Sequence, residues 1–420
     1  MKHIIVGNSF AGIFAVEAIR KVDPQSSILL ISDEARHTYS RAMIHEYLAD
    51  LVDDRYLDLR DRDFYQRLAV ETWLGQAVTR IDTEKRVVWT NGQSTPYEKL
   101  LLAVGGSPIV PPGIDGLDNY TDVYRFTTLH DCVELRKAVE RTDSVVVLGG
   151  GLIGLQCAEG LAHLGKKVHV VELMSHILPL ALDGTAAAMV RRELEGEGVR
   201  FYMEDTVAAL RGSRRQLHGV TLKSGIEIDC GAFVLAIGVR PNVTLTKETP
   251  IHVDRGIVVN EYMETSVSGV YAAGDCAQAF ERLSGKAVPI PIIPVATEQG
   301  EVAGYNMAGV RRAYGGGLSL NALEFGTLPI ISYGRVNEEE GSEVVRVLDE
   351  RRGIYKKVIL KEGKIVGALF VRDIRRAGIF RHLLQEGIPV APFQEKLLSE
   401  NFGFAHLPRD LRDRLFTVPQ

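Results

Sequence analysis

Cysteine is scarce in this sequence, which has four cysteines in 420 residues. They occur singly, and no two have the short spacing of a CxxC pair. This distribution excludes a disulfide-stapled scaffold and the clustered ligands of zinc or iron–sulfur centres. Dispersed cysteines are typical of a reducing compartment, so we expect a cytoplasmic protein. They are Cys132, Cys157, Cys230 and Cys276.

Long apolar runs and an excess of positive charge are also missing. No stretch approaches the roughly 18 consecutive apolar residues of a membrane-spanning helix, so we expect no span. Lys and Arg number 49 against 54 Asp and Glu, which argues against a nucleic-acid partner. The apolar stretch in residues 1–7 is too short for a secretory signal. The length of the chain predicts roughly two to four globular domains.

Glycine, in contrast, is abundant at 41 residues and often follows short apolar strands. After the apolar residues 144–148, the chain carries the pattern G-x-G-x-x-G at the start of a predicted helix. Such a turn lets the backbone approach a pyrophosphate, which the helix N-terminus then faces. The sequence therefore predicts a dinucleotide site. Its residues are Gly149, Gly151, Leu152, Ile153 and Gly154.

An acidic residue follows this turn at the distance expected for ribose recognition. Glu172 ends the next predicted strand, where its carboxylate can accept hydrogen bonds from both ribose hydroxyls. The same charge would repel a 2′-phosphate. The pattern therefore favours NADH over NADPH.

The N-terminus carries a second, less regular version of the same pattern. Gly7 and Gly12 hold the outer positions, and Ser9 replaces the middle glycine. Serine is small enough for close approach, and its hydroxyl can bond a phosphate oxygen. Two acidic residues follow the next predicted strand, so we expect a second dinucleotide site. Its residues are Gly7, Ser9, Phe10, Ala11, Gly12, Asp33 and Glu34.

A third apolar strand, residues 269–273, ends at Gly274 and Asp275. A strand-terminal aspartate can bond the ribityl hydroxyls of a flavin. An ordinary helix N-cap is the alternative for this residue type.

The order of these signals predicts an α/β protein with two Rossmann-like dinucleotide-binding domains and a smaller C-terminal α+β domain. Residues 108–112 read as a linker, and a second crossover is expected near residues 238–242. From about residue 318, short strands surround the hairpin turn Glu362-Gly363.

Together, these segments resemble the two-dinucleotide-binding-domain flavoproteins called pyridine nucleotide-disulfide oxidoreductases, over essentially the whole chain. The resemblance rests on residues 7–12, 102–106, 149–154, 236–242 and 272–275. It implies FAD on the first turn and at Gly274-Asp275, and NADH on the middle turn. It also implies an FAD domain over residues 1–110 and 239–316, an NAD domain over 111–238 and an interface domain over 317–420.

The resemblance implies further cofactor contacts. Arg41 corresponds to a residue that contacts the FAD pyrophosphate, and Gly105 and Gly238 lie in motifs close to the cofactors. Backbone contacts to the flavin are implied at Pro294 and Val295. Hydride transfer between nicotinamide and flavin needs no side-chain acid or base, so no catalytic residue is assigned and no metal is expected.

The branch of the family is indicated by a missing thiol. Ala42 stands where single-cysteine members carry their redox cysteine, and Tyr39-Ser40-Arg41 resembles the rubredoxin and ferredoxin reductases and the flavin part of nitrite reductases. This resemblance implies an oxidoreductase that passes electrons from NADH through FAD to a carrier protein or to a larger redox complex. The basic segment 372–381 is a candidate docking site for an acidic carrier.

Two other interpretations stay open. One is an NADH oxidase, or a peroxide or disulfide reductase, for which Cys276 is the single thiol placed near the predicted cofactor. The other is a flavin-bound signalling or interaction protein with slow redox turnover. Whether the chain forms a homo-oligomer is also left open by the sequence.

Overall fold

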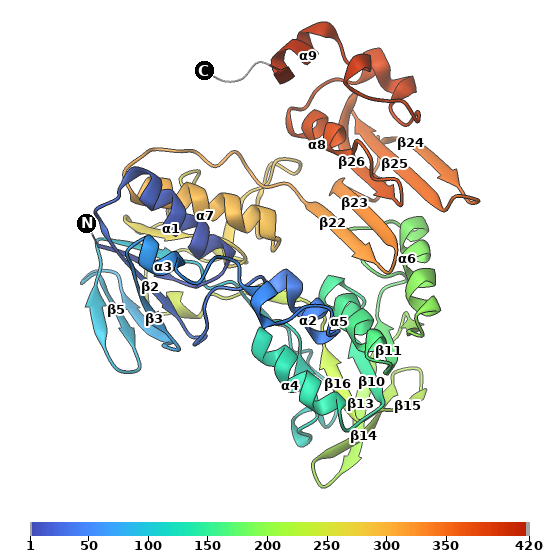
Figure 1. The fold of residues 1–420 in the computed structure, drawn as a ribbon, viewed down its shortest axis with the longest axis horizontal. Coiled ribbons are helices and arrows are strands. Elements are labelled where there is room, and N and C mark those ends of the chain that lie inside the picture. The colour runs from blue at the N-terminus through green and yellow to red at the C-terminus, as the bar shows by residue number, and fades with distance from the viewer. Residues whose placement is uncertain (1, 417–420) are drawn as a thin grey trace.

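The computed structural model describes residues 2–416, which form three bodies of secondary structure (Figure 1). Two contain a five-stranded parallel sheet, and the third contains a five-stranded antiparallel sheet. The predicted fold class is therefore confirmed. No helix between residues 2 and 416 combines the length and the hydropathy that a bilayer-spanning segment requires.

The first parallel sheet has the strand order β19-β7-β1-β2-β3. Its central strands are almost continuous aliphatic runs, as is typical of sheets buried on both faces. The strands are β1 (Lys2–Val6), β2 (Ser27–Ser32), β3 (Val70–Leu74), β7 (Lys99–Leu102) and β19 (Val270–Ala272). Its helices are α1 (Phe10–Val22), α3 (Phe64–Arg67) and α7 (Ile293–Met307). Helix α2 (Ile44–Leu48) follows β2 in the chain but packs against two helices of the second body, α4 (Leu129–Val139) and α5 (Leu152–His163). Figure 1 shows α1 and α7 lying side by side although they are far apart in sequence.

Two small three-stranded sheets accompany this body. They are β4 (Val78–Asp82), β5 (Val87–Thr90) and β6 (Ser94–Pro96), and β18 (Ile257–Val258), β20 (Ala277–Phe280) and β21 (Ala287–Val288).

Strand β1 carries a histidine that is fully buried and without a hydrogen-bond partner for either ring nitrogen. Burial lowers the pKa of His3 to about 4, from an ordinary 6.5. The unfolded chain therefore binds this proton more tightly than the folded chain, and stability falls as the pH drops from 6.5 towards 4. The shift corresponds to about 3 kcal/mol of lost stability at the acid end.

Replacing His3 by leucine should remove this dependence. Between pH 7 and pH 4, the free energy of unfolding of His3→Leu should fall by about 3 kcal/mol less than that of the wild type. Chemical denaturation at a series of pH values measures the difference, with the exposed His218→Leu as the matched control. Parallel pH profiles for His3→Leu and the wild type would contradict the prediction.

The second parallel sheet has the order β12-β11-β10-β16-β9 and repeats the architecture of the first. Its strands are β9 (Val123–Arg125), β10 (Ser144–Leu148), β11 (Lys167–Glu172), β12 (Arg200–Met203) and β16 (Ala232–Leu235). Its helices are α4 (Leu129–Val139), α5 (Leu152–His163) and α6 (Gly184–Gly196). An antiparallel sheet covers it, formed by β13 (Val207–Ser213), β14 (Gln216–Leu222) and β15 (Glu227–Asp229).

The chain passes between the two parallel sheets twice, and the two crossings pair with each other. Strands β8 (Gly106–Pro108) and β17 (Val239–Pro241) form an antiparallel ribbon. The ribbon meets the expected linker, residues 108–112, only at Pro108, and β17 lies within the expected second crossover, residues 238–242.

The C-terminal sheet has the order β22-β23-β26-β25-β24. The predicted hairpin turn lies between β25 and β26, and Glu362 and Gly363 both have positive φ. The strands are β22 (Leu320–Phe325), β23 (Leu328–Gly334), β24 (Glu343–Asp349), β25 (Ile354–Lys361) and β26 (Lys364–Val371), and they are followed by α8 (Ala377–Gln385) and α9 (Arg409–Phe416).

One side of this sheet shares a hydrophobic core with the second parallel sheet. Phe325, Leu328 and Tyr355 belong to the same buried cluster as Val190 and Leu194 of α6. A second cluster, beneath α8, belongs to the C-terminal body. The C-terminal sheet is therefore fixed firmly to the middle body.

Candidate functional site

The N-terminal glycine turn is closed so tightly that two of its positions cannot carry a side chain. Gly7 has φ +122°, and a Cβ there would lie 2.1 Å from the carbonyl oxygen of Ala103. A Cβ at Gly12 would lie 2.0 Å from the Gly7 carbonyl oxygen. Ser9 occupies the N-cap of α1, but its hydroxyl makes no capping hydrogen bond. The hydroxyl and the first N–H groups of α1, which begins at Phe10, form a cradle suited to a phosphate.

The loop after β2 separates the two predicted acidic residues. Asp33 is exposed, whereas Glu34 turns inward. The Tyr39 hydroxyl donates to Glu34 Oε2 at 2.7 Å, and the Arg41 guanidinium forms an ion pair with Glu34 Oε1. Arg41 Nη1 also donates to the Thr127 carbonyl oxygen at 2.8 Å. The structure thus pairs Glu34 directly with Arg41, whereas Asp33 reaches Arg41 only through its charge.

The third predicted strand end lies between the first turns of α1 and α7. A Cβ on Gly274, which has φ +79°, would lie 3.2 Å from Ala11 Cβ and 3.6 Å from Ala296 Cβ. Asp275 follows and is half-buried. Burial raises the pKa of Asp275, and the positive charge of Arg41 opposes the rise. The two charged residues therefore interact across the same end of the first sheet.

Helix α7 presents its N-terminus at this place. Pro294 lies in its first turn and is exposed, while Val295 is buried. Pro294 has no N–H, so the unpaired donors of this turn come from its neighbours, including Val295. A Cβ at Gly300 would lie 2.2 Å from the Ala11 carbonyl oxygen. This close crossing of α1 and α7 fixes both N-termini around one end of the sheet.

The middle glycine turn has the same construction but one open position. A Cβ at Gly149 would lie 2.4 Å from the Ala236 carbonyl oxygen, and one at Gly154 would lie 2.0 Å from the Gly149 carbonyl oxygen. A Cβ at Gly151 would meet nothing within 4 Å. Gly149 and Gly154 are therefore required for the packing of the turn. Gly151 instead leaves open space in front of the N-terminus of α5, which begins with Leu152 and Ile153.

Glu172 ends β11 and faces this turn. Its Oε2 accepts a hydrogen bond from the Gly150 N–H at 2.6 Å, and its Oε1 accepts one from the Met174 N–H at 2.8 Å. Leu173, the next residue, is 66% exposed. Each carboxylate oxygen keeps a further lone pair, so the group can hold the turn and still accept from a ribose hydroxyl.

Gly105 and Gly238 lie at the ends of the ribbon that joins the two parallel sheets. Both have positive φ, at +62° and +109°. The Gly105 carbonyl oxygen accepts from the Asn242 N–H at 2.9 Å, and the Gly238 carbonyl oxygen accepts from the Ile109 N–H at 3.0 Å. Both glycines thus shape the crossing, and their contact with a cofactor stays a prediction.

The four cysteines are free and buried. Cys276 is fully buried, and its Sγ donates to the carbonyl oxygens of Leu102 at 3.2 Å and Ala273 at 3.4 Å. Burial raises the pKa of the Cys276 thiol to about 12. This thiol therefore packs in the core and is not available as a thiolate.

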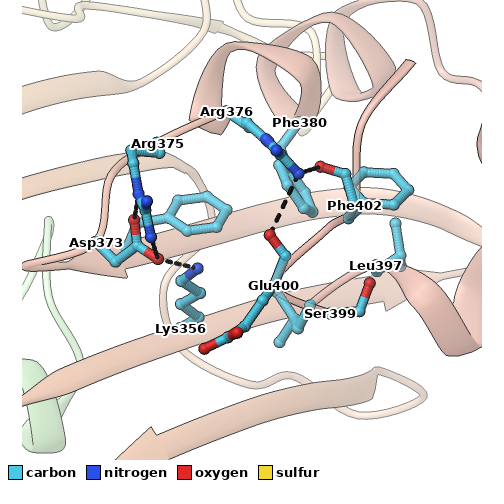
Figure 2. A pocket seen from close by; sticks show the side chains of 11 residues that line it. Lys356, Asp373, Arg375, Arg376, Phe380, Leu397, Ser399, Glu400 and Phe402 are labelled. Carbon is cyan, nitrogen blue, oxygen red and sulfur yellow. Dashed lines mark hydrogen bonds and ion pairs between the residues drawn. The ribbon is translucent and has the colours of Figure 1, made fainter. Parts of the chain in front are cut away.

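The basic segment 372–381 is largely occupied by internal contacts. Figure 2 shows Arg375 and Lys356 pointing to Asp373, and Arg376 pointing to the carbonyl oxygens of Glu400 and Phe402. These residues line a cavity of about 70 Å³. These contacts fasten the C-terminal residues onto the sheet.

Arg381, on α8, is different. It is exposed, and no hydrogen bond or ion pair of this side chain occurs among residues 2–416. Burial raises the pKa of Glu298 on α7, and Arg381 is one of the cations that oppose this rise. Arg381 therefore lies within electrostatic reach of the N-terminal half of α7.

Several supporting contacts were missed by sequence reasoning. Asn8, inside the first glycine turn, accepts from the Tyr65 hydroxyl at 2.6 Å and donates to the Arg36 carbonyl oxygen at 3.1 Å. The Tyr65 hydroxyl in turn accepts from the Thr38 N–H at 3.1 Å. Asn8 occupies a variable position of the glycine motif, and Tyr65 lies 57 residues away from it in sequence, so no spacing pattern points to this pair.

The chain matches the family model of the pyridine nucleotide-disulphide oxidoreductases over residues 1–300. It also matches the model of the rubredoxin NAD+ reductase C-terminal domain over residues 320–388. The chain therefore belongs to the pyridine nucleotide-disulphide oxidoreductase family. The proteins of this family are NAD(P)H-dependent flavin oxidoreductases that bind FAD and NADH.

The relatives match the chain over different shares of its length. One relative is subunit epsilon of the NADH-dependent phenylglyoxylate dehydrogenase of Aromatoleum evansii. It is 31% identical over 95% of this chain and 94% of its own length. The rubredoxin-NAD(+) reductase of Pseudomonas putida is 30% identical over 74% of this chain and 80% of its own length.

Two relatives are much longer than this chain. The nitrite reductase [NAD(P)H] of Bacillus subtilis is 33% identical over 88% of this chain but 45% of its own length. The chain likewise spans 48% of a second Bacillus subtilis relative, an assimilatory nitrate reductase electron transfer subunit. Among solved structures, the NAD-dependent persulfide reductase from A. fulgidus is 26% identical with a TM-score of 0.86, over 93% of this chain and 78% of that one.

Proposed function

We propose that this protein passes electrons from NADH through FAD to another redox protein, either a small carrier such as rubredoxin or ferredoxin or a partner subunit of a larger complex. The observation that carries the proposal is the pair of glycine turns facing neighbouring sheet ends, with no thiol exposed beside them among the described cysteines. The scattered, reduced cysteines favour the cytoplasm as its compartment.

The proposal assigns FAD to a domain formed by residues 1–110 and 239–316. FAD supplies the chemistry, because it accepts a hydride and releases electrons one at a time. The chain supplies the cradle of the first turn for the pyrophosphate, with Arg41 as its cation. Glu34 serves the adenosine ribose, and Asp275 serves the ribityl chain. The N-terminus of α7 offers its N–H donors to the flavin ring.

The proposal assigns NADH to residues 111–238 and the interface to residues 317–420. Gly151 leaves the space that the NADH pyrophosphate fills, and Glu172 accepts from the adenosine ribose. These residues would hold NADH in place for hydride transfer, a step whose rate depends mainly on correct positioning.

The choice of acceptor rests on two observations. The C-terminal part resembles the matching domain of rubredoxin NAD+ reductase, and residue 42 is alanine. The buried Cys276 leaves a disulfide or persulfide substrate without a nucleophile. The interpretations as a thiol-dependent oxidase and as a disulfide reductase are therefore less well supported.

Arg381 provides a test of carrier docking. Arg381→Glu should lower kcat/KM for an acidic carrier about tenfold at low ionic strength, because surface complementarity acts mainly on association. Reduction of the flavin by NADH should be unchanged. Arg351→Glu, which makes the same charge change on the exposed turn after β24, is the control.

Steady-state carrier reduction across a range of salt concentrations measures this effect. The wild type and Arg351→Glu should lose activity as salt rises, and Arg381→Glu should lose less, since its favourable charge is already gone. Equal rates for the three proteins at low salt would reject docking at Arg381.

A further inference from the structure

We infer that Tyr39 is a positioning residue, which holds Glu34 and Arg41 in place for FAD and ties both to the N-terminus of α4. The inference rests on the proposed function. Tyr39 belongs to the loop after β2 of the first body, and α4 belongs to the second, so one side chain joins the predicted FAD site to the neighbouring domain.

The Tyr39 hydroxyl uses both its donor and an acceptor position. It donates to Glu34 Oε2 at 2.7 Å and accepts from the Leu129 N–H at 3.0 Å. The side chain is 5% exposed. Arg41 Cζ lies 5.3 Å from the centre of the Tyr39 ring. The phenol is therefore surrounded by the two residues assigned to FAD and by the first residue of α4.

The partner at α4 is a rigid one. Thr128 caps the helix, with its Oγ1 accepting from the Asp131 N–H at 3.1 Å, and Asp131 Oδ2 accepts from the Thr128 N–H at 2.9 Å. The Leu129 N–H has no partner inside the helix, because the first turn leaves its donors free. Tyr39 satisfies this donor, and the Thr127 carbonyl oxygen receives Arg41 at 2.8 Å.

The arrangement decides how Glu34 and Arg41 interact. Tyr39 occupies Glu34 Oε2, and Arg41 pairs with Oε1. A carboxylate with both oxygens free tends to take an arginine in a bidentate pair. Tyr39 fixes the orientation of the carboxylate so that Arg41 Nη2 meets Oε1, while Arg41 Nη1 donates to the Thr127 carbonyl oxygen. The remaining N–H groups of the guanidinium then stay available for a phosphate. Without the hydroxyl, Glu34 can compete with the FAD pyrophosphate for Arg41.

Tyr39→Phe is the direct test. Apoprotein is titrated with FAD, and the dissociation constant is read from the quenching of flavin fluorescence. We expect FAD binding to weaken about tenfold, as loss of a hydrogen bond to a charged group does. Tyr97→Phe is the matched control, since its buried hydroxyl has no hydrogen-bond partner in the described chain, and its FAD affinity should stay within about twofold of wild type.

A second background separates positioning from general stability. In Glu34→Gln, residue 34 has no negative charge and no longer competes with the FAD pyrophosphate for Arg41. Adding Tyr39→Phe to this variant should therefore weaken FAD binding less than about twofold. Thermal unfolding of each apoprotein confirms that it is folded. An equal loss in both backgrounds, or unchanged affinity in Tyr39→Phe alone, would overturn the inference. Failure of the wild-type apoprotein to bind FAD would instead defeat the proposed function.

Discussion

Gly151→Ala should lower kcat/KM for NADH by about a hundredfold while leaving FAD bound and the protein folded. The reason is the space at this position, where a new Cβ would meet no protein atom within 4 Å. The fold can therefore accept the methyl group. A pyrophosphate bound in this space would be pushed away by the methyl group, and a displacement of about 1 Å is enough to cost two orders of magnitude in hydride transfer.

Two further glycine variants make this result specific. Gly184→Ala, at the start of α6, also places its Cβ in open space and should leave kcat/KM and stability unchanged. Gly154→Ala should destabilise the second parallel sheet, because its Cβ would lie 2.0 Å from a carbonyl oxygen. Stopped-flow reduction by NADH together with thermal unfolding distinguishes the three. Normal NADH kinetics in Gly151→Ala would show that the pyrophosphate binds elsewhere.

Removing the charge of Glu172 should reduce the preference for NADH over NADPH by about ten- to a hundredfold, as expected for a hydrogen bond to a carboxylate. Glu172→Gln keeps an oxygen that can accept from the Gly150 N–H, so the turn should survive. Adding Leu173→Arg places a cation on an exposed neighbour, 66% accessible in the present structure. The double variant should prefer NADPH.

The measurement is the ratio of kcat/KM for the two nucleotides. Glu195→Gln, an exposed glutamate on α6 paired with Arg191, makes the same chemical change outside the site and should keep the wild-type ratio. An unchanged ratio in Glu172→Gln would mean that this carboxylate shapes the turn without reading the ribose.

The glycine turns could be found from the sequence because their constraint is local. Gly7 and Gly12 are five residues apart, as are Gly149 and Gly154. In each pair, a Cβ on the second glycine would lie 2.0 Å from the carbonyl oxygen of the first, so the second position accepts only glycine. The flanking strands are aliphatic runs that have few alternatives to a buried parallel sheet. The fold class and the positions of both glycine turns follow from such short-range rules.

The connections between bodies could not be predicted in this way. Tyr39 and Leu129 are 90 residues apart, and their hydrogen bond depends on how two sheets are placed. The close crossing of α1 and α7, at Ala11 and Gly300, is likewise a property of the assembled fold. The sequence predicts that Arg375 and Arg376 belong to an exposed basic docking surface. In the structure, Arg375 donates to the Asp373 carboxylate and Arg376 donates to the Phe402 carbonyl oxygen.

Anaerobic stopped-flow mixing of the purified protein with NADH, followed by a second mix with an electron carrier, tests the central claim most directly. We expect a yellow protein that one equivalent of NADH bleaches rapidly and that rubredoxin or ferredoxin reoxidises much faster than a disulfide does. A polypeptide that cannot be reconstituted with FAD, or one whose reoxidation requires Cys276, would contradict the account.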